Sequence, residues 1–354
     1  MEESHGLVEL ASGVDSIYLS SRPNVSEKLF RDLSFLSQNA RELDQDSVPY
    51  QIGTEYFEVL NHRWQNYAVC IRHNHGLIGF TKSKSFPGVR VQIYSEFLHA
   101  VGAEEAIRWF TNILKLEGIA VEWTVSRIDL FMDIQGWDIA NTNRDEFISK
   151  AKAFGIDGDD SVYTGYRFGR RTTGTVIARI YNKTEEIKVS GKDWMKLIWG
   201  SDWNSNEDVW RIEFEVHSQF FREVGLGSAS LVLSKIDQIW ITLTQSWLSH
   251  RIVGDDTNSS RWPLSAEWIF VQGCSFVHNF IPLKRIRQVK RVHHLDSIMA
   301  GLKGYVTSAS AHSDAQSLPE CMAFVEACLG EYDRGSRKTF VETLNKKRDW
   351  LKSL

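Results

Sequence analysis

The feature that most limits the fold of this chain is a set of three runs in which apolar and polar residues alternate. They read SRIDLFMDI (126–134), WRIEFEVH (210–217) and ARIYNK (178–183). Because successive side chains of a β-strand point to opposite faces, each run predicts a strand with one apolar and one polar face. Strands joined by short links favour antiparallel pairing, so the three runs indicate an antiparallel sheet with a polar face.

The rest of the chain combines shorter strands with helices. We expect strands at 16–20, in EYFEVL, NYAVCIR, LIGFTK and VRVQIY, and near SVYTGYRFG, and helices at 25–41, 103–116 and 144–154. After His217 the apolar spacing is helical over 227–250 and from 264 onward. This order predicts an α+β fold, a central antiparallel sheet flanked by helices and followed by a mostly helical C-terminal region. The polar stretch DDTNSSR (255–261) predicts a linker between domains at 12–250 and 262–354.

Composition limits the class of protein further. The 354 residues carry a formal net charge of −4, which argues against a wholly basic surface. Basic residues gather in two segments: 161–192 holds seven against two acids, and 284–291 holds five with no acid. Such segments suit a polyanion that touches part of the surface, although a solvated charged face is the commoner interpretation. Four scattered cysteines indicate neither a disulfide framework nor a zinc site, and without a signal peptide or membrane span we expect a cytoplasmic protein.

The polar strand faces are rich in acids. Asp129 and Asp133 share a face of the first run, and Glu213 and Glu215 share a face of the second. Like charges this close raise each other's pKa unless a cation neutralises them. Mg²⁺ or Mn²⁺ with oxygen ligands would do so, and so would a lattice of salt bridges to the arginines of the same faces, Arg127 and Arg211. Both interpretations remain open from the residues alone.

The third run places Tyr181 between Arg179 and Lys183 on one face. A free tyrosine has a pKa of about 10 and is a poor nucleophile at neutral pH. Adjacent cations would favour the phenolate and hold a phosphate, which suits in-line attack on a phosphodiester. A merely solvated strand face is the plainer alternative.

The motifs SRIDLFMD, GYRFGRR, ARIYNKTEE and WRIEFEVH, in this order, resemble the Rep_trans family of rolling-circle replication initiators. The resemblance covers about residues 12–250. It implies a fold similar to the HUH nucleases and a metal-dependent DNA nickase and strand transferase. Tyr181 would attack the DNA, keep the 5′-phosphate and release a 3′-hydroxyl primer. The metal ligands would come from Asp129, Asp133, Glu213 and Glu215.

The same resemblance implies origin DNA as the partner, with a host helicase and polymerase, and a homodimer that supplies two tyrosines. A conjugative relaxase would use the same chemistry, but relaxases of this kind often carry an extra N-terminal domain, and only a dozen residues are expected before the first strand here. A non-catalytic origin-binding protein on this scaffold is a further alternative, against which the intact tyrosine and acids argue.

DNA contacts are expected in both basic segments. The candidates are Tyr166, Arg167, Arg170, Arg171, Lys284, Arg285, Arg287, Lys290 and Arg291. Arginines near a hairpin tip also serve solubility, and an aromatic in a strand is by default a core residue. The triplet HNH at 73–75 is weak evidence for a metal site, whereas His217 continues the acidic strand face as a fifth candidate group.

Overall fold

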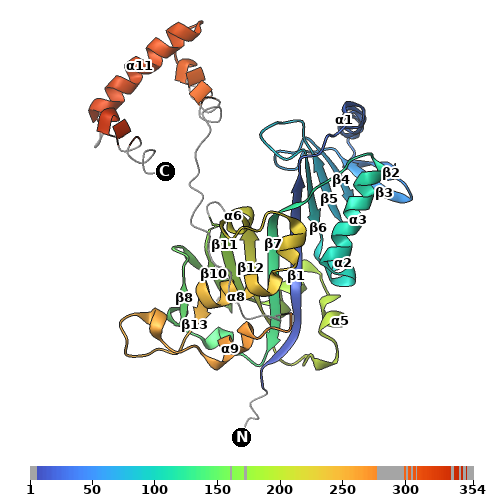
Figure 1. The fold of residues 1–354 in the computed structure, drawn as a ribbon, viewed down its shortest axis with the longest axis vertical. Helices are drawn as coiled ribbons and strands as arrows, with labels where there is room; N and C mark the ends of the chain where they lie inside the picture. The colour runs from blue at the N-terminus through green and yellow to red at the C-terminus, as the bar shows by residue number, and fades with distance from the viewer. Residues whose placement is uncertain are drawn as a thin grey trace. The chain divides into compact units, whose positions relative to one another are not determined.

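The computed structural model describes residues 6–159, 162–170, 174–276, 299, 302–303, 306–307, 309–335, 339–342, 344–345 and 348, with backbone only for 157–159 and 162–164. Within this part of the chain, eleven strands form one antiparallel sheet in the order β2-β3-β4-β5-β6-β1-β7-β12-β11-β10-β9 (Figure 1). The strands are β1 Val8–Ser21, β2 Ser47–Ile52, β3 Glu55–Leu60, β4 Val69–His73, β5 Gly76–Phe80, β6 Val89–Ile93, β7 Thr124–Gln135, β9 Phe154–Asp159, β10 Val162–Phe168, β11 Val176–Asn182 and β12 Trp210–His217. A separate pair joins β8 (Phe147–Ser149) to β13 (Leu248–His250).

The helices are α1 Glu27–Glu42, α2 Ser95–Val101, α3 Ala103–Leu116, α4 Lys183–Ser190, α5 Met195–Trp199, α6 Ser218–Glu223, α7 Ala229–Leu233, α8 Ile236–Ser246, α9 Ala266–Gln272 and α11 Leu318–Gly335. The α+β class, with an antiparallel sheet flanked by helices and a helical C-terminal region, is confirmed. No helix in the described ranges is both long and apolar enough to cross a bilayer.

In both halves of the sheet the apolar face is packed against helices, but the helices differ between the two halves. In the N-terminal half, α1 packs on β2, β3 and β4, and α3 packs on β6. In the C-terminal half, Phe214 of β12 meets Trp240 of α8 with ring centroids 5.4 Å apart. The opposite face of the central strands is covered at one end by α4 and α5, through a cluster of Leu10, Ile187, Met195, Trp199 and Val209. The rest of that face carries the polar residues.

The prediction of a helix at 144–154 is wrong. A 3-10 turn at Arg144–Glu146 is followed by the short strand β8, because Phe147 enters the core beside Phe168, with ring centroids 5.8 Å apart. The expected helix at 227–250 is likewise divided into α7, α8 and the strand β13. The first strand begins at Val8, eight residues before the expected start.

The chain forms two compact units, residues 1–287 and 288–354. The first unit extends beyond the expected linker at 255–261, since α9 packs against α8. There the indole nitrogen of Trp240 donates to the carbonyl of Val271 at 2.9 Å. In the second unit, the described part is dominated by α11.

Candidate active site

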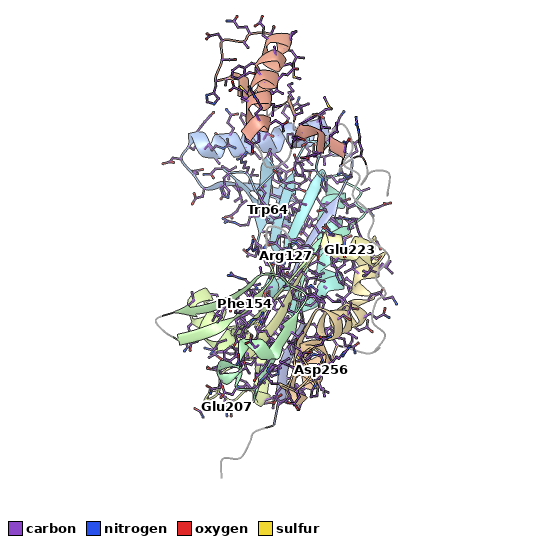
Figure 2. All side chains as sticks on the ribbon, turned by 90° about the vertical axis from the view of Figure 1, so that its left-hand side faces the viewer. Trp64, Arg127, Phe154, Glu207, Glu223 and Asp256 are labelled. Atoms are coloured by element: carbon purple, nitrogen blue, oxygen red, sulfur yellow. The ribbon has the colours of Figure 1, made fainter. Side chains whose placement is uncertain are left out.

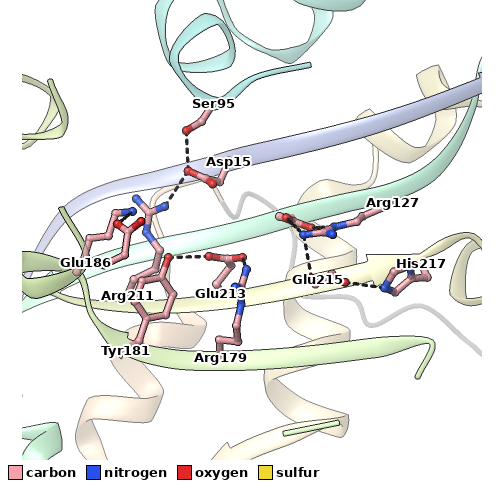
Figure 3. Close-up of polar contacts among 12 residues, drawn as sticks. Asp15, Ser95, Arg127, Arg179, Tyr181, Glu186, Arg211, Glu213, Glu215 and His217 are labelled. Carbon is pink, nitrogen blue, oxygen red and sulfur yellow. Dashed lines mark hydrogen bonds and ion pairs between the residues drawn. The ribbon is translucent and has the colours of Figure 1, made fainter. Parts of the chain in front are cut away.

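Strand register brings the polar residues of the three predicted runs onto one face of the sheet. In the pairing of β12 with β7, Arg211 lies opposite Asp133 and Glu215 lies opposite Asp129. In the pairing of β11 with β12, Tyr181 lies opposite Arg211, and Arg179 lies opposite Glu213. The prediction that these residues share a face is confirmed for the strand residues, of which Arg179, Tyr181 and Glu213 are labelled in Figure 3. Lys183 is the exception, because it lies at the start of a helix and not in the strand.

Tyr181 is the centre of this face. Its hydroxyl donates to Oε2 of Glu213 at 2.9 Å, and Arg179 forms an ion pair with Oε1 of the same carboxylate. Strand β11 ends at Asn182, whose side chain caps α4, so Lys183 is the first helical residue rather than a strand residue. Its ammonium nitrogen still lies 5.7 Å from the Tyr181 ring centroid, and the Arg179 guanidinium carbon lies 5.8 Å from it.

The electrostatics of Tyr181 differ from the simple expectation of an activated phenolate. Burial and the Glu213 carboxylate raise the pKa of Tyr181 well above its usual value, although Arg211 and Arg179 oppose the shift. The flanking cations therefore do not by themselves deprotonate the tyrosine. A base must take its proton, and the carboxylate of Glu213 already accepts the hydroxyl hydrogen bond.

Arg211 forms a buried ionic cluster behind the tyrosine. Its Nε and Nη2 bind the two oxygens of Asp133 at 2.6 and 2.8 Å, and its Nη1 binds Asp15 at 2.7 Å. The indole nitrogen of Trp199 also donates to Asp133, at 2.9 Å. Burial would raise the pKa of Asp15, but Arg211 and the hydrogen bond from His99 hold it well below the usual value. Both oxygens of Asp133 are thus occupied, and the cluster fixes β12 against β7 and β1.

A second ionic cluster lies where the polar face is more open. Arg127 binds both oxygens of Asp129, at 2.8 and 2.6 Å, and contacts Glu215 at 2.8 Å. The ring of His217 lies 2.9 Å from the other oxygen of Glu215, so the fifth candidate group joins the site. Burial raises the pKa of Asp129 to about 7, with help from the charges of Glu213 and Glu215 and against the pull of Arg127.

The acids fit the salt-bridge interpretation as they stand. Each of the four pairs with an arginine, and the described residues contain no group of three His, Cys, Asp or Glu side chains arranged to hold a metal. Asp133 is fully engaged by Arg211 and Trp199. The charges of Glu213 and Glu215 both raise the pKa of Asp129. The oxygens of these three acids are occupied as well: Arg127 binds both oxygens of Asp129, Arg179 and Tyr181 contact those of Glu213, and Arg127 and His217 contact those of Glu215.

The residues predicted to contact DNA lie in different parts of the structure. The structure corrects the prediction that Tyr166 stacks on DNA bases. Its ring is buried in the core and its hydroxyl donates to the carbonyl of Thr142 at 2.8 Å, so it has no free face for a base. Arg167 is exposed and lies opposite Arg179, on the face of Tyr181, and Arg170 is exposed beyond it. The candidates Arg171, Lys284, Arg285, Arg287, Lys290 and Arg291 lie outside the described residues.

Sequence reasoning missed three groups of the site. Asp15 reaches Arg211 because β1 has a bulge between Val14 and Ser16, and a bulge cannot be recognised from alternation. Trp199 comes from α5, which has no polar strand pattern. Glu186 follows Lys183 by three residues in a helix, the spacing of a helical ion pair, and this signal was available in the sequence.

The HNH triplet is not part of the acidic site. His73 and His75 lie at the turn between β4 and β5, with ring centroids 4.5 Å apart. His75 stacks on Phe97 at 3.8 Å, and burial lowers the pKa of both histidines. The pair therefore belongs to an aromatic cluster.

Known proteins resemble this chain in structure rather than in sequence. No family model matches the sequence, and no curated protein matches it. Among solved structures, the chain is similar to one described as a rolling circle replication initiator protein from Geobacillus stearothermophilus. The match covers 79% of this chain and 99% of that chain, with 14% sequence identity and a TM-score of 0.39.

Proposed function

We propose that this protein nicks one strand of DNA through Tyr181 and thereby starts rolling-circle replication. The observation that carries the proposal is the hydrogen bond from the Tyr181 hydroxyl to Glu213, with the cationic groups of Arg179 and Lys183 5.8 and 5.7 Å from the ring centroid. Together with the ordered motifs of the sequence, this arrangement supports a tyrosine nucleophile with a base in contact. Because the pKa of Tyr181 is raised, its hydroxyl must give up its proton to a base as it attacks, and the Glu213 carboxylate is the group in contact that can accept it.

The reaction assigns a task to each neighbour of the tyrosine. Glu213 takes the phenolic proton as the oxygen of Tyr181 attacks phosphorus. The phosphorus–oxygen bond to the 3′ carbon breaks, the 5′-phosphate stays on the tyrosine, and the departing 3′ oxygen takes a proton from water. Protonation of Glu213 weakens its ion pair with Arg179, so the guanidinium becomes available to the charged phosphate at the moment that charge develops.

We also propose that some of the acids hold a divalent cation. Asp129 and Glu215 would hold Mg²⁺ or Mn²⁺ through carboxylate oxygens, the ligand type that these ions prefer, once the partly exposed Arg127 moves away, and Glu213 stays free to act as the base. When bound, the ion would stabilise the negative charge of the phosphate being attacked. Asp133 is left out of this set, since its partner Arg211 is fully buried and binds both of its oxygens, whereas Arg127 is 20% exposed.

The test uses a supercoiled plasmid that carries the DNA surrounding the protein's own gene. Incubation with Mg²⁺ or Mn²⁺ should relax the plasmid and leave protein on a 5′ end. Tyr181→Phe should abolish both results, whereas Tyr56→Phe, at a 68% exposed side chain on β3, should change neither. Unchanged topology with retained DNA binding would instead support a non-catalytic origin-binding protein.

A further inference from the structure

The polar face continues beyond the candidate active site as a row of alternating arginine and aromatic side chains. The guanidinium carbon of Arg127 lies 5.1 Å from the ring centroid of Tyr18. That of Arg90 lies 5.2 Å from the Tyr18 ring and 5.1 Å from the Trp64 ring. Arg127, Tyr18, Arg90 and Trp64 are called the stacking row below. The row begins at the arginine that binds Asp129 and Glu215.

The order of the strands determines how the stacking row crosses the sheet. Tyr18 of β1 is the register partner of Arg127 on β7, and Arg90 lies on the next strand, β6. Figure 2 shows Trp64 above Arg127. The row therefore leads away from the acidic site across β1 and β6, over the half of the sheet whose other face is covered by α1 and α3.

Trp64 is held in place by local structure. It pairs with Tyr67 across a tight turn through two backbone hydrogen bonds of 3.0 and 2.9 Å. Both rings lie on Gly79 of β5, where an added Cβ would come within 2.8 Å of the Cβ of Tyr67 and 3.0 Å of Cε3 of Trp64. Any larger residue at this position would push the aromatic rings off the sheet.

Arg90 carries a charge that no neighbouring acid neutralises. Its Nη1 donates to the amide oxygen of Gln65 at 2.8 Å, and among the described residues no carboxylate lies within ion-pair distance of it. Other arginines of this region are paired, for example Arg72 with Glu58 at 2.6 Å. An unneutralised cation resting on two aromatic rings favours a ligand that is both anionic and aromatic.

We propose that the stacking row binds single-stranded DNA and directs it to Tyr181. Unpaired bases would stack on Trp64 and Tyr18, and the phosphates would be neutralised by Arg90. Bases in a duplex are already stacked on one another, so the rings can accept only unpaired bases. The inference rests on the proposed nicking function, since it concerns the path of the strand that Tyr181 attacks.

Binding is measured in the full-length Tyr181→Phe background, which cannot cut the strand, by fluorescence anisotropy of a labelled thymidine oligonucleotide. Trp64→Ala should weaken binding about 10-fold or more, because base–aromatic stacking contributes strongly per base. Arg90→Gln should weaken binding and reduce the slope of log affinity against log salt by about 1. Two exposed positions on α1 serve as controls, and Phe35→Ala and Arg31→Gln should bind like the parent. Parental affinity in both row variants would overturn the inference.

Two measurements guard against misfolding as the cause. Trp64→Phe keeps an aromatic ring and should retain most of the affinity. An oligonucleotide with 5-bromodeoxyuridine should cross-link to peptides that contain Tyr18 or Trp64, and cross-links found only elsewhere would also overturn the inference. Adduct formation by the wild-type chain is scored separately. An adduct without row-dependent binding refutes the row alone, and row-dependent binding without an adduct refutes the nicking reaction alone.

Discussion

Replacing Arg211 by methionine should destabilise the protein strongly. The guanidinium is fully buried and binds the two oxygens of Asp133 at 2.6 and 2.8 Å, as well as Asp15 at 2.7 Å. Methionine fills a similar volume but leaves both carboxylates without their cation. Removing one partner of a buried ion pair costs about 3–5 kcal/mol, and with two carboxylates affected we expect a loss of about 5 kcal/mol. Total stabilities are about 5–15 kcal/mol, so the variant will unfold at much lower denaturant.

Urea unfolding followed by circular dichroism measures this loss through the shift of the midpoint at unchanged slope. Arg108→Met is the matched control, since Arg108 pairs with Glu105 on the surface and such a pair contributes at most about 1 kcal/mol. Adding Asp133→Asn to Arg211→Met should recover part of the loss, because a neutral amide is cheaper to bury unpaired than a carboxylate. A loss below about 1 kcal/mol for Arg211→Met would refute the view of Arg211 as the ionic centre of these strands.

Three further outcomes are expected. Glu213→Gln should lower the nicking rate by about 100-fold or more with DNA binding retained, since it removes the proposed base, while the exposed Glu122→Gln should nick normally in the same plasmid assay. Because the pKa of Asp129 is raised to about 7, the stability this group contributes is present at low pH and is lost as pH rises toward 7. In EDTA, the unfolding free energy of the wild type relative to Asp129→Asn should fall by about 2–3 kcal/mol between about pH 5 and about pH 8, and a constant difference would contradict the shift. Gly165→Ala should impair nicking and lower the melting temperature, since its Cβ would lie 2.4 Å from the carbonyl oxygen of Ile180 and 2.9 Å from the Cα of Tyr181, whereas Gly227→Ala meets nothing within 4 Å and should resemble the wild type in both assays.

The alternating runs were enough to predict which side chains share a face. Alternation depends only on the strand repeat, so Asp129, Arg211 and Tyr181 could be placed on one face without any knowledge of the fold. The sequence also predicted that the acids would be neutralised, and it left metal and arginine as the two alternatives. It could not say which arginine meets which acid, because that pairing depends on strand register.

The errors have physical causes as well. The residues from 144 onward have helical spacing, but Phe147 gains more by entering the aromatic core, and tertiary packing overrides the local preference. Tyr166 was a candidate for stacking on unpaired bases, with core packing as the default, and strand parity puts its side chain on the core face while Arg167 points to the other face. The contact of Asp15 with Arg211 could not be predicted, because a β-bulge redirects the Asp15 side chain. Long-range packing of this kind has no signature in a short window of sequence.

The central claim is that Tyr181 forms the covalent bond to DNA. The most direct measurement is mass spectrometry of the protein after reaction with its plasmid and digestion of the DNA by nuclease. We expect a tryptic peptide containing Tyr181 to carry the mass of a 5′-linked nucleotide, and we expect no such peptide from Tyr181→Phe. Nucleotide attached to any other residue, or an adduct that persists in Tyr181→Phe, would contradict the account.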